Sequence, residues 1–192
     1  MEVSQTTLVT APTLKPVTLV QAKKQCEIGQ DDTTHDDQLT MLIDVATDQF
    51  ENDCDICLLT QTQRVYAEEF SDDEIYLPKR PVQSITSIKY FDDANTQQTL
   101  STDIYSLNAP ERSVELKFNQ VWPSVATDRW DAVEITYVCG YSSADLVPAS
   151  ARHAILLLVG YYFGQNRGDN DRPSDMEAYR RLVKQFLRSN YP

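Results

Sequence analysis

The chain has 192 residues, of which 41% are hydrophobic and 24% are charged, and a formal net charge of −12. This composition is typical of a globular protein with one good core, and it excludes a largely disordered chain. The acidic balance disfavours tight binding to DNA, which depends on lysine and arginine contacts to phosphate. The five glycines are isolated from one another, so no glycine-rich phosphate-binding loop is present.

The charge is unevenly distributed along the chain. Residues 1–60 carry a net charge of −8 and residues 61–140 carry −6, whereas residues 141–192 carry +2. A solvated acidic surface explains each acidic cluster without any further role. Only the basic C-terminal end is therefore expected to contact an acidic partner.

The first 16 residues show no hydrophobic periodicity and include Pro12 and Pro16. They predict an extended arm without a core of its own, which we expect to order against a neighbouring subunit.

Two helices are predicted next. Thr18 is a good N-cap for a short helix over 19–26. The second helix, from about residue 36 to 54, is the clearest in the chain because its apolar residues recur at helical spacing. These residues are Leu39, Leu42, Ile43, Ala46 and Phe50.

From residue 59 the period changes to that of strands. Strands are predicted at 61–67, 75–77, 82–90, 98–100, 105–107, 114–118 and 132–138. The spacing of apolar residues in the third of these also predicts a β-bulge. Short polar turns leave no room for crossover helices, so the strands should be mostly antiparallel.

The chain ends with two predicted helices. The helix over about 148–165 is apolar on nearly every side and should lie in the core. The last helix, from about residue 174, has an apolar stripe of Tyr179, Leu182, Val183 and Phe186. Its basic flank consists of Arg180, Arg181, Lys184 and Arg188. The stripe either packs on the helices of its own subunit or docks into a partner, and the sequence favours neither.

These elements predict an α+β fold. It has a four-helix core, two helices from each end of the chain, with an inserted, mostly antiparallel β-lobe. The expected parts are the extended arm (1–16), the N-terminal helices (17–58), the β-lobe (59–141) and the C-terminal helices (142–192).

No group of residues has the spacing of a catalytic or cofactor site. The nucleophile motif of serine hydrolases is absent, and neither His35 nor His153 has a partner motif. The longest apolar stretch, 154–163, is too short to span a bilayer, and no signal-peptide pattern is present. We therefore expect a protein made in the cytoplasm that is neither an enzyme nor membrane-bound and needs no cofactor.

The four cysteines are Cys26, Cys54, Cys57 and Cys139. Free, buried thiols are expected in the reducing cytoplasm. Cys54 and Cys57 have the spacing of a zinc or redox pair, but no second clustered pair of ligands exists. Neighbouring Asp53 and Asp55 also oppose redox reactivity, so no metal is predicted.

The order of these segments resembles that of the head–tail connector (adaptor) proteins of tailed phages. The resemblance covers residues 16–167. It rests on the segments 17–23, 37–51, 59–62, 77–90, 122–123, 135–141, 147–158 and 166–167. The chain departs from the family pattern at Cys26 and Glu27, and its last helix fits loosely.

This resemblance implies a structural virion protein at the head–tail interface. Adaptors form a ring, typically of 12 copies, beneath the portal and above a stopper or tail-completion protein. DNA passes through the ring without specific binding. Within that framework, Tyr179, Arg180, Arg181, Lys184 and Arg188 are the candidate portal-docking residues.

Two other interpretations remain open. One is a different ring subunit of the same particle, such as a stopper, head-completion or tail-terminator protein. The other is a small-molecule or metal-binding α+β domain that uses the cysteines and His35.

Overall fold

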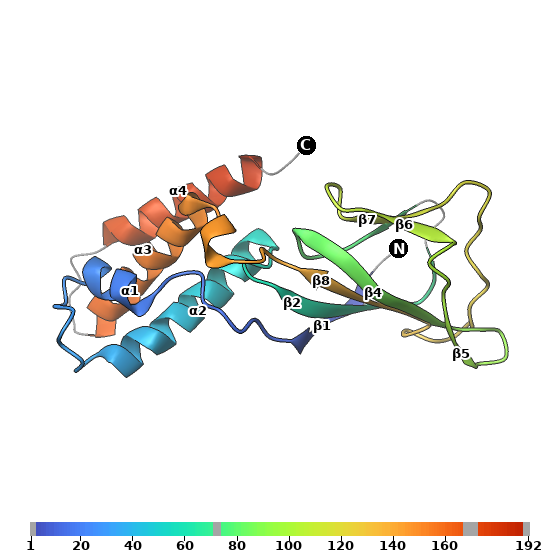
Figure 1. The fold of residues 1–192 in the computed structure, drawn as a ribbon, viewed down its shortest axis with the longest axis horizontal. Helices are drawn as coiled ribbons and strands as arrows, with labels where there is room; N and C mark the ends of the chain where they lie inside the picture. The colour runs from blue at the N-terminus through green and yellow to red at the C-terminus, as the bar shows by residue number, and fades with distance from the viewer. Residues whose placement is uncertain (1–2, 71–73, 167–172, 190–192) are drawn as a thin grey trace. The chain divides into compact units, whose positions relative to one another are not determined.

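The computed structural model describes residues 3–70, 74–166 and 173–189. The chain divides into two compact units (Figure 1). The strand unit comprises Met1–Pro12 and Thr60–Gly140, and the helical unit comprises Thr13–Leu59 and Tyr141–Pro192. The predicted α+β class, a helical core with inserted antiparallel strands, is confirmed.

The described residues of the helical unit form four α-helices and one 3-10 helix. They are α1 (Leu19–Gln25), α2 (Asp36–Cys54), η1 (Ala144–Leu146), α3 (Ala149–Asn166) and α4 (Pro173–Ser189). The N-cap of α1 is a capping box: Thr18 Oγ1 accepts from the Gln21 amide, and the Thr18 amide donates to Gln21 Oε1 at 2.8 Å. The predicted second helix, 36–54, is confirmed at both ends.

The core of the helical unit forms around α3, which contacts α1, α2 and α4. Because α3 is covered on several sides, it needs apolar residues around its circumference, as the sequence predicted. Ile155 and Leu158 of α3 are fully buried, as are Leu39 and Phe50 of α2. The predicted apolar stripe of α2 is the face that enters this core.

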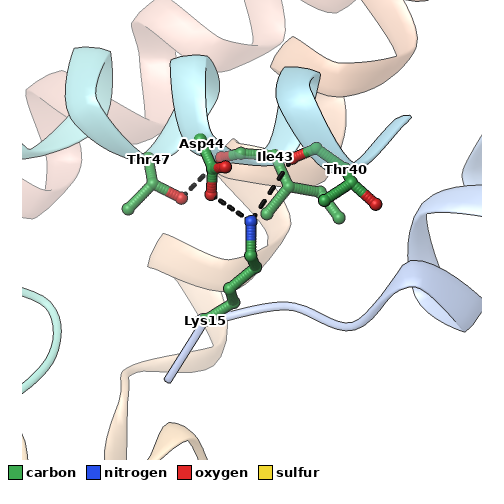
Figure 2. Close-up of polar contacts among 5 residues, drawn as sticks. All are labelled: Lys15, Thr40, Ile43, Asp44 and Thr47. Atoms are coloured by element: carbon green, nitrogen blue, oxygen red, sulfur yellow. Dashed lines mark hydrogen bonds and ion pairs between the residues drawn. The ribbon is translucent and has the colours of Figure 1, made fainter. Parts of the chain in front are cut away.

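The segment that precedes α1 is attached to α2. Lys15 Nζ contacts the Asp44 carboxylate and lies 3.5 Å from the Thr40 carbonyl oxygen (Figure 2). Both charged side chains are largely exposed, so this ion pair stabilises the unit by less than about 1 kcal/mol. Val17, which is 1% exposed, is the stronger anchor of the segment because it is buried in the core.

The described strands of the strand unit form two antiparallel sheets. One has the order β1-β2-β8-β4-β5, and the other β3-β7-β6. The strands are β1 (Val3–Thr10), β2 (Gln61–Ala67), β3 (Glu74–Tyr76), β4 (Val82–Phe91), β5 (Gln97–Thr99), β6 (Tyr105–Asn108), β7 (Ser113–Leu116) and β8 (Val133–Cys139). Two register shifts between β4 and β8, at Val82/Ser84 and Ile85/Ser87, confirm the predicted bulge.

Strand β8 is the centre of the larger sheet and carries its most buried residues. The Tyr137 side chain is fully buried, and its hydroxyl accepts a hydrogen bond from the Lys79 amide at 3.2 Å. Burial raises the pKa of Tyr137 to about 12. The sequence places β8 last among the strands, and only the fold puts it between β2 and β4.

The N-terminal arm, which we expected to order against a neighbouring subunit, has a partner within its own chain. Residues 3–10 form β1, which pairs antiparallel with β2 from Val3↔Ala67 to Thr10↔Thr62. The physical reason is that this stretch is rich in threonine and valine, which favour strands, and that β2 offers it an edge. The alternation of apolar and polar residues that indicates a half-buried strand is weak in β1, because five residues of this strand are exposed.

Candidate docking surface on helix α4

The basic flank of α4 is exposed to solvent. Arg180, Arg181 and Lys184 are all exposed, and Arg181 Nη2 forms an ion pair with Glu177 Oε1 at 2.6 Å. Because this pair is exposed and lies at the i, i+4 spacing, it contributes only tenths of a kcal/mol and leaves the basic surface available. The side chain of Arg188 lies outside the described residues.

The apolar stripe of α4 packs on its own subunit. Tyr179 is 2% exposed and Phe186 is 5% exposed, and both belong to the core of the helical unit. Their rings make edge contacts with Phe50 of α2, with centroids 6.3 and 5.6 Å away. Of the two interpretations left open for the stripe, the structure supports the intramolecular one.

Tyr179 is therefore excluded from the docking surface. Its hydroxyl donates a hydrogen bond to Asp53 Oδ2 of α2 at 2.5 Å. Burial, followed by the hydrogen bond to Asp53 and then by the negative charge of Asp53, raises the pKa of Tyr179 well above its usual value. The residue joins α4 to α2 and is not available to a partner.

Replacing Tyr179 with phenylalanine should lower the free energy of unfolding by about 2 kcal/mol, since a buried hydrogen bond to a charged group is lost. Urea denaturation followed by circular dichroism measures this loss. Because burial raises the pKa of Tyr179 in the folded protein, the advantage of tyrosine should be present at neutral pH and should shrink as the pH rises above about 10, the ordinary pKa of an unfolded tyrosine. Tyr161→Phe is the control, because its hydroxyl accepts a hydrogen bond from the exposed side chain of Gln165 and not from a buried group.

A shallow groove lies beside the basic flank. It has a volume of about 370 Å³ and is formed by His153 and Leu157 of α3 together with residues of α4 that include Ala178, Arg181 and Leu182. Leu157, Ala178 and Leu182 supply apolar lining, and the Arg181–Glu177 ion pair also lines the groove. The α3 residues of this groove were missed at the sequence level, because the spacing along α3 does not say which of its faces lies next to α4.

Within the part of the chain that the structure describes, neither histidine lies beside a catalytic partner. His35 packs edge-on against the Phe163 ring, with centroids 5.3 Å apart, and His153 is exposed in the α4 groove. Among the described residues, one carboxylate group could hold a cation: Glu74, Glu111 and Glu115. Asn108 already donates to two of these carboxylates, and an acidic group alone does not define a metal site.

The prediction of four free thiols is wrong for two of them. Cys57 and Cys139 are disulfide-bonded, whereas Cys26 and Cys54 are buried thiols outside any disulfide. The prediction rested on the usual redox state of the cytoplasm and not on geometry, which the sequence does not contain. A disulfide-bonded Cys57 cannot pair with Cys54 in a zinc site.

The chain has the fold of proteins from gene transfer agent (GTA) particles. A chain of the virion of a native GTA particle matches it with a TM-score of 0.75 at 20% identity. A chain of the neck of an empty GTA particle, computed with C6 symmetry, matches with a TM-score of 0.75 at 19% identity. A chain of the native neck, computed with C12 symmetry, matches with a TM-score of 0.69 at 19% identity. Each match covers 95% of this chain and 94% of the other.

The fold is thus one that occurs in the virion and the neck of GTA particles. The model of the head completion protein family matches residues 18–175, which is most of the chain. The protein belongs to the head completion protein family, and the resemblance to phage head–tail connector and completion proteins is confirmed. No curated protein matches the chain. None of the described helices is long and apolar enough to cross a membrane.

Proposed function

We propose that this protein is an adaptor subunit of a phage neck, one copy in a ring between the portal and a stopper or tail-completion protein. The observation that carries the proposal is the family match over residues 18–175, joined by the likeness of the whole fold to chains of GTA necks. The role is structural, and the protein works by binding its neighbours.

The ring is expected to hold 12 copies. One of the similar neck structures was computed with C12 symmetry, which accommodates 12 equivalent chains. A closed ring requires two different surfaces on each subunit, one for each neighbour. The protein therefore needs at least these two contacts in addition to those with the components above and below it.

The charge of the protein suits a channel for DNA. With a net charge of −12, the subunit offers little counterion release to a passing duplex. DNA then slides through the ring without specific binding. Short duplex DNA in low salt should not bind the assembled ring measurably, and strong binding would contradict a passive channel.

Assembly on the portal is the direct test of the adaptor role. Mass photometry of the protein alone and with the portal ring of its own phage counts the copies that bind. A gain of about 12 subunits by the portal supports the adaptor. A protein that ignores the portal but binds a preformed neck is a stopper, and one that binds neither is not a neck component.

The basic flank of α4 is the proposed contact with the portal. Arg180→Glu/Lys184→Glu reverses two exposed charges and should lower portal affinity at least about tenfold, because like charges would face each other across the contact. The same mass photometry titration measures the loss. Lys24→Glu/Lys117→Glu is the matched control, since both lysines are exposed and lie outside α4.

Surface variants are needed because removal of α4 would not separate docking from folding. Tyr179 and Phe186 belong to the core, so deletion of residues 174–192 should unfold the helical unit. If the α4 variant binds the portal as tightly as its control, the contact lies elsewhere on the subunit.

A stopper is the second candidate. One similar neck structure was computed with C6 symmetry, and the family is described as head completion proteins. A stopper would bind only after an adaptor ring is present on the portal, whereas an adaptor binds the portal directly. The order in which the components are added therefore distinguishes the two roles.

A further inference from the structure

The strand unit contains an aromatic pocket that is separate from the proposed docking residues of α4. The aromatic pocket is formed by residues 68–70, which follow β2, and by residues 121–130 of the long connection between β7 and β8, with Leu116 at one side. Its volume is about 1040 Å³. A pocket of this size can hold several side chains of a bound segment.

Stacked and exposed aromatic rings form the walls of the pocket. The Phe70 and Trp122 rings are stacked, with centroids 4.8 Å apart and planes 4° from parallel. Trp130 packs edge-on against Tyr66 at 5.3 Å but remains 51% exposed. Val121, which also lines the pocket, is 78% exposed. Exposed apolar side chains gathered in a pocket are typical of a site of protein contact.

The rim of the pocket is acidic. Glu68, Glu69 and Asp128 line it and are exposed, and none of them forms an ion pair with another described residue. Arg129, the one cation among the described lining residues, is already engaged. Its guanidinium donates two hydrogen bonds to the Asp131 carboxylate at 3.0 and 2.9 Å and a third to Asn95.

Arg129 also lies over the Phe91 ring, 3.6 Å from the centroid. Its charge is therefore neutralised and its position is fixed, so it cannot compensate the negative charges of the rim carboxylates. Three carboxylates thus surround aromatic walls without a cation of their own.

We propose that this pocket binds an arginine- or lysine-bearing segment of a partner protein. A guanidinium stacks on the exposed Trp130 ring while Glu68 and Glu69 bond its edge, and an apolar residue of the same segment contacts Val121 and Trp122. Nucleic acid does not fit, because the acidic rim repels phosphate. The proposal concerns a different surface from α4 and does not depend on ring formation.

The protein carries its own probe of this site. The chain has two tryptophans, Trp122 and Trp130, and both line the pocket. Intrinsic tryptophan fluorescence therefore reports on the pocket alone. The titrant is an acetylated and amidated hexapeptide of alternating leucine and arginine, and the control peptide has citrulline, which is neutral and nearly isosteric, in place of arginine.

The arginine peptide should change the fluorescence saturably and bind at least about tenfold more tightly than the citrulline peptide, since charge pairing supplies the selectivity. Glu68→Gln/Glu69→Gln should weaken its binding by a similar factor. The matched control, Asp37→Asn/Asp48→Asn, removes two exposed acids of the helical unit and should leave binding unchanged. High salt should weaken binding because the rim is exposed.

Equal binding of the two peptides, or of the Glu68/Glu69 variant and its control, would overturn the proposal. A fluorescence change that depends on protein concentration without peptide would also overturn it, because a second copy of the chain would then occupy the pocket. Circular dichroism of each variant shows whether it is folded. Trp130→Phe keeps an aromatic ring at this position, so its affinity for the arginine peptide tests the preference for tryptophan.

Discussion

Replacing Phe50 with alanine is expected to lower the free energy of unfolding of the helical unit by about 4 kcal/mol. Phe50 of α2 is completely buried, and its ring contacts the rings of both Tyr179 and Phe186 of α4. The substitution removes a large apolar side chain and leaves a cavity between the two helices. It also removes the aromatic contacts through which α4 is attached to α2.

Urea denaturation followed by the helical circular dichroism signal measures this effect. Met41→Ala on the same helix is the matched control, because Met41 is 54% exposed and should change the stability by less than about 0.5 kcal/mol. A loss below about 1 kcal/mol for Phe50→Ala would mean that α4 is not held by this cluster.

Replacing Lys23 with methionine is expected to cost about 3 kcal/mol, because the substitution leaves a carboxylate without its partner. Lys23 is 3% exposed at the end of α1, and its Nζ lies 2.6 Å from Asp36 Oδ1 at the start of α2. It also donates to the Gln30 carbonyl oxygen at 3.1 Å. The ammonium group therefore links α1, the following loop and α2.

A double-mutant cycle separates the ion pair from the packing of the lysine stem. Asp36→Asn in the Lys23→Met background should recover part of the lost stability, since the unpaired charge is then removed. Lys24→Met is the control, because Lys24 is exposed on the same helix. Additive effects of the two substitutions would show that the pair is not coupled.

The candidate docking surface was only partly predictable from the sequence. The basic character of Arg180, Arg181 and Lys184 follows from their identity, and their exposure follows from the opposite apolar stripe. Whether Tyr179 faces a partner or its own core did not follow, because an apolar stripe has the same spacing in both cases. The decision required Phe50 and Asp53, which lie far from Tyr179 in the sequence.

Local patterns determined the elements. The sequence by itself places α1, α2 and the strands from β2 to β8 close to their observed positions, because capping residues and hydrophobic period act within a few residues. It also determined the all-round apolar character of α3, the bulge in β4 and the net negative charge.

Only the tertiary structure decided which elements meet. It paired the N-terminal residues of β1 with β2, inserted β8 between β2 and β4, and buried Lys23 against Asp36. It gathered Phe70, Trp122 and Trp130 around one pocket and left Cys57 and Cys139 disulfide-bonded. The physical reason is that these contacts join residues distant in sequence, and their free energy depends on burial and geometry that arise only when the chain has folded.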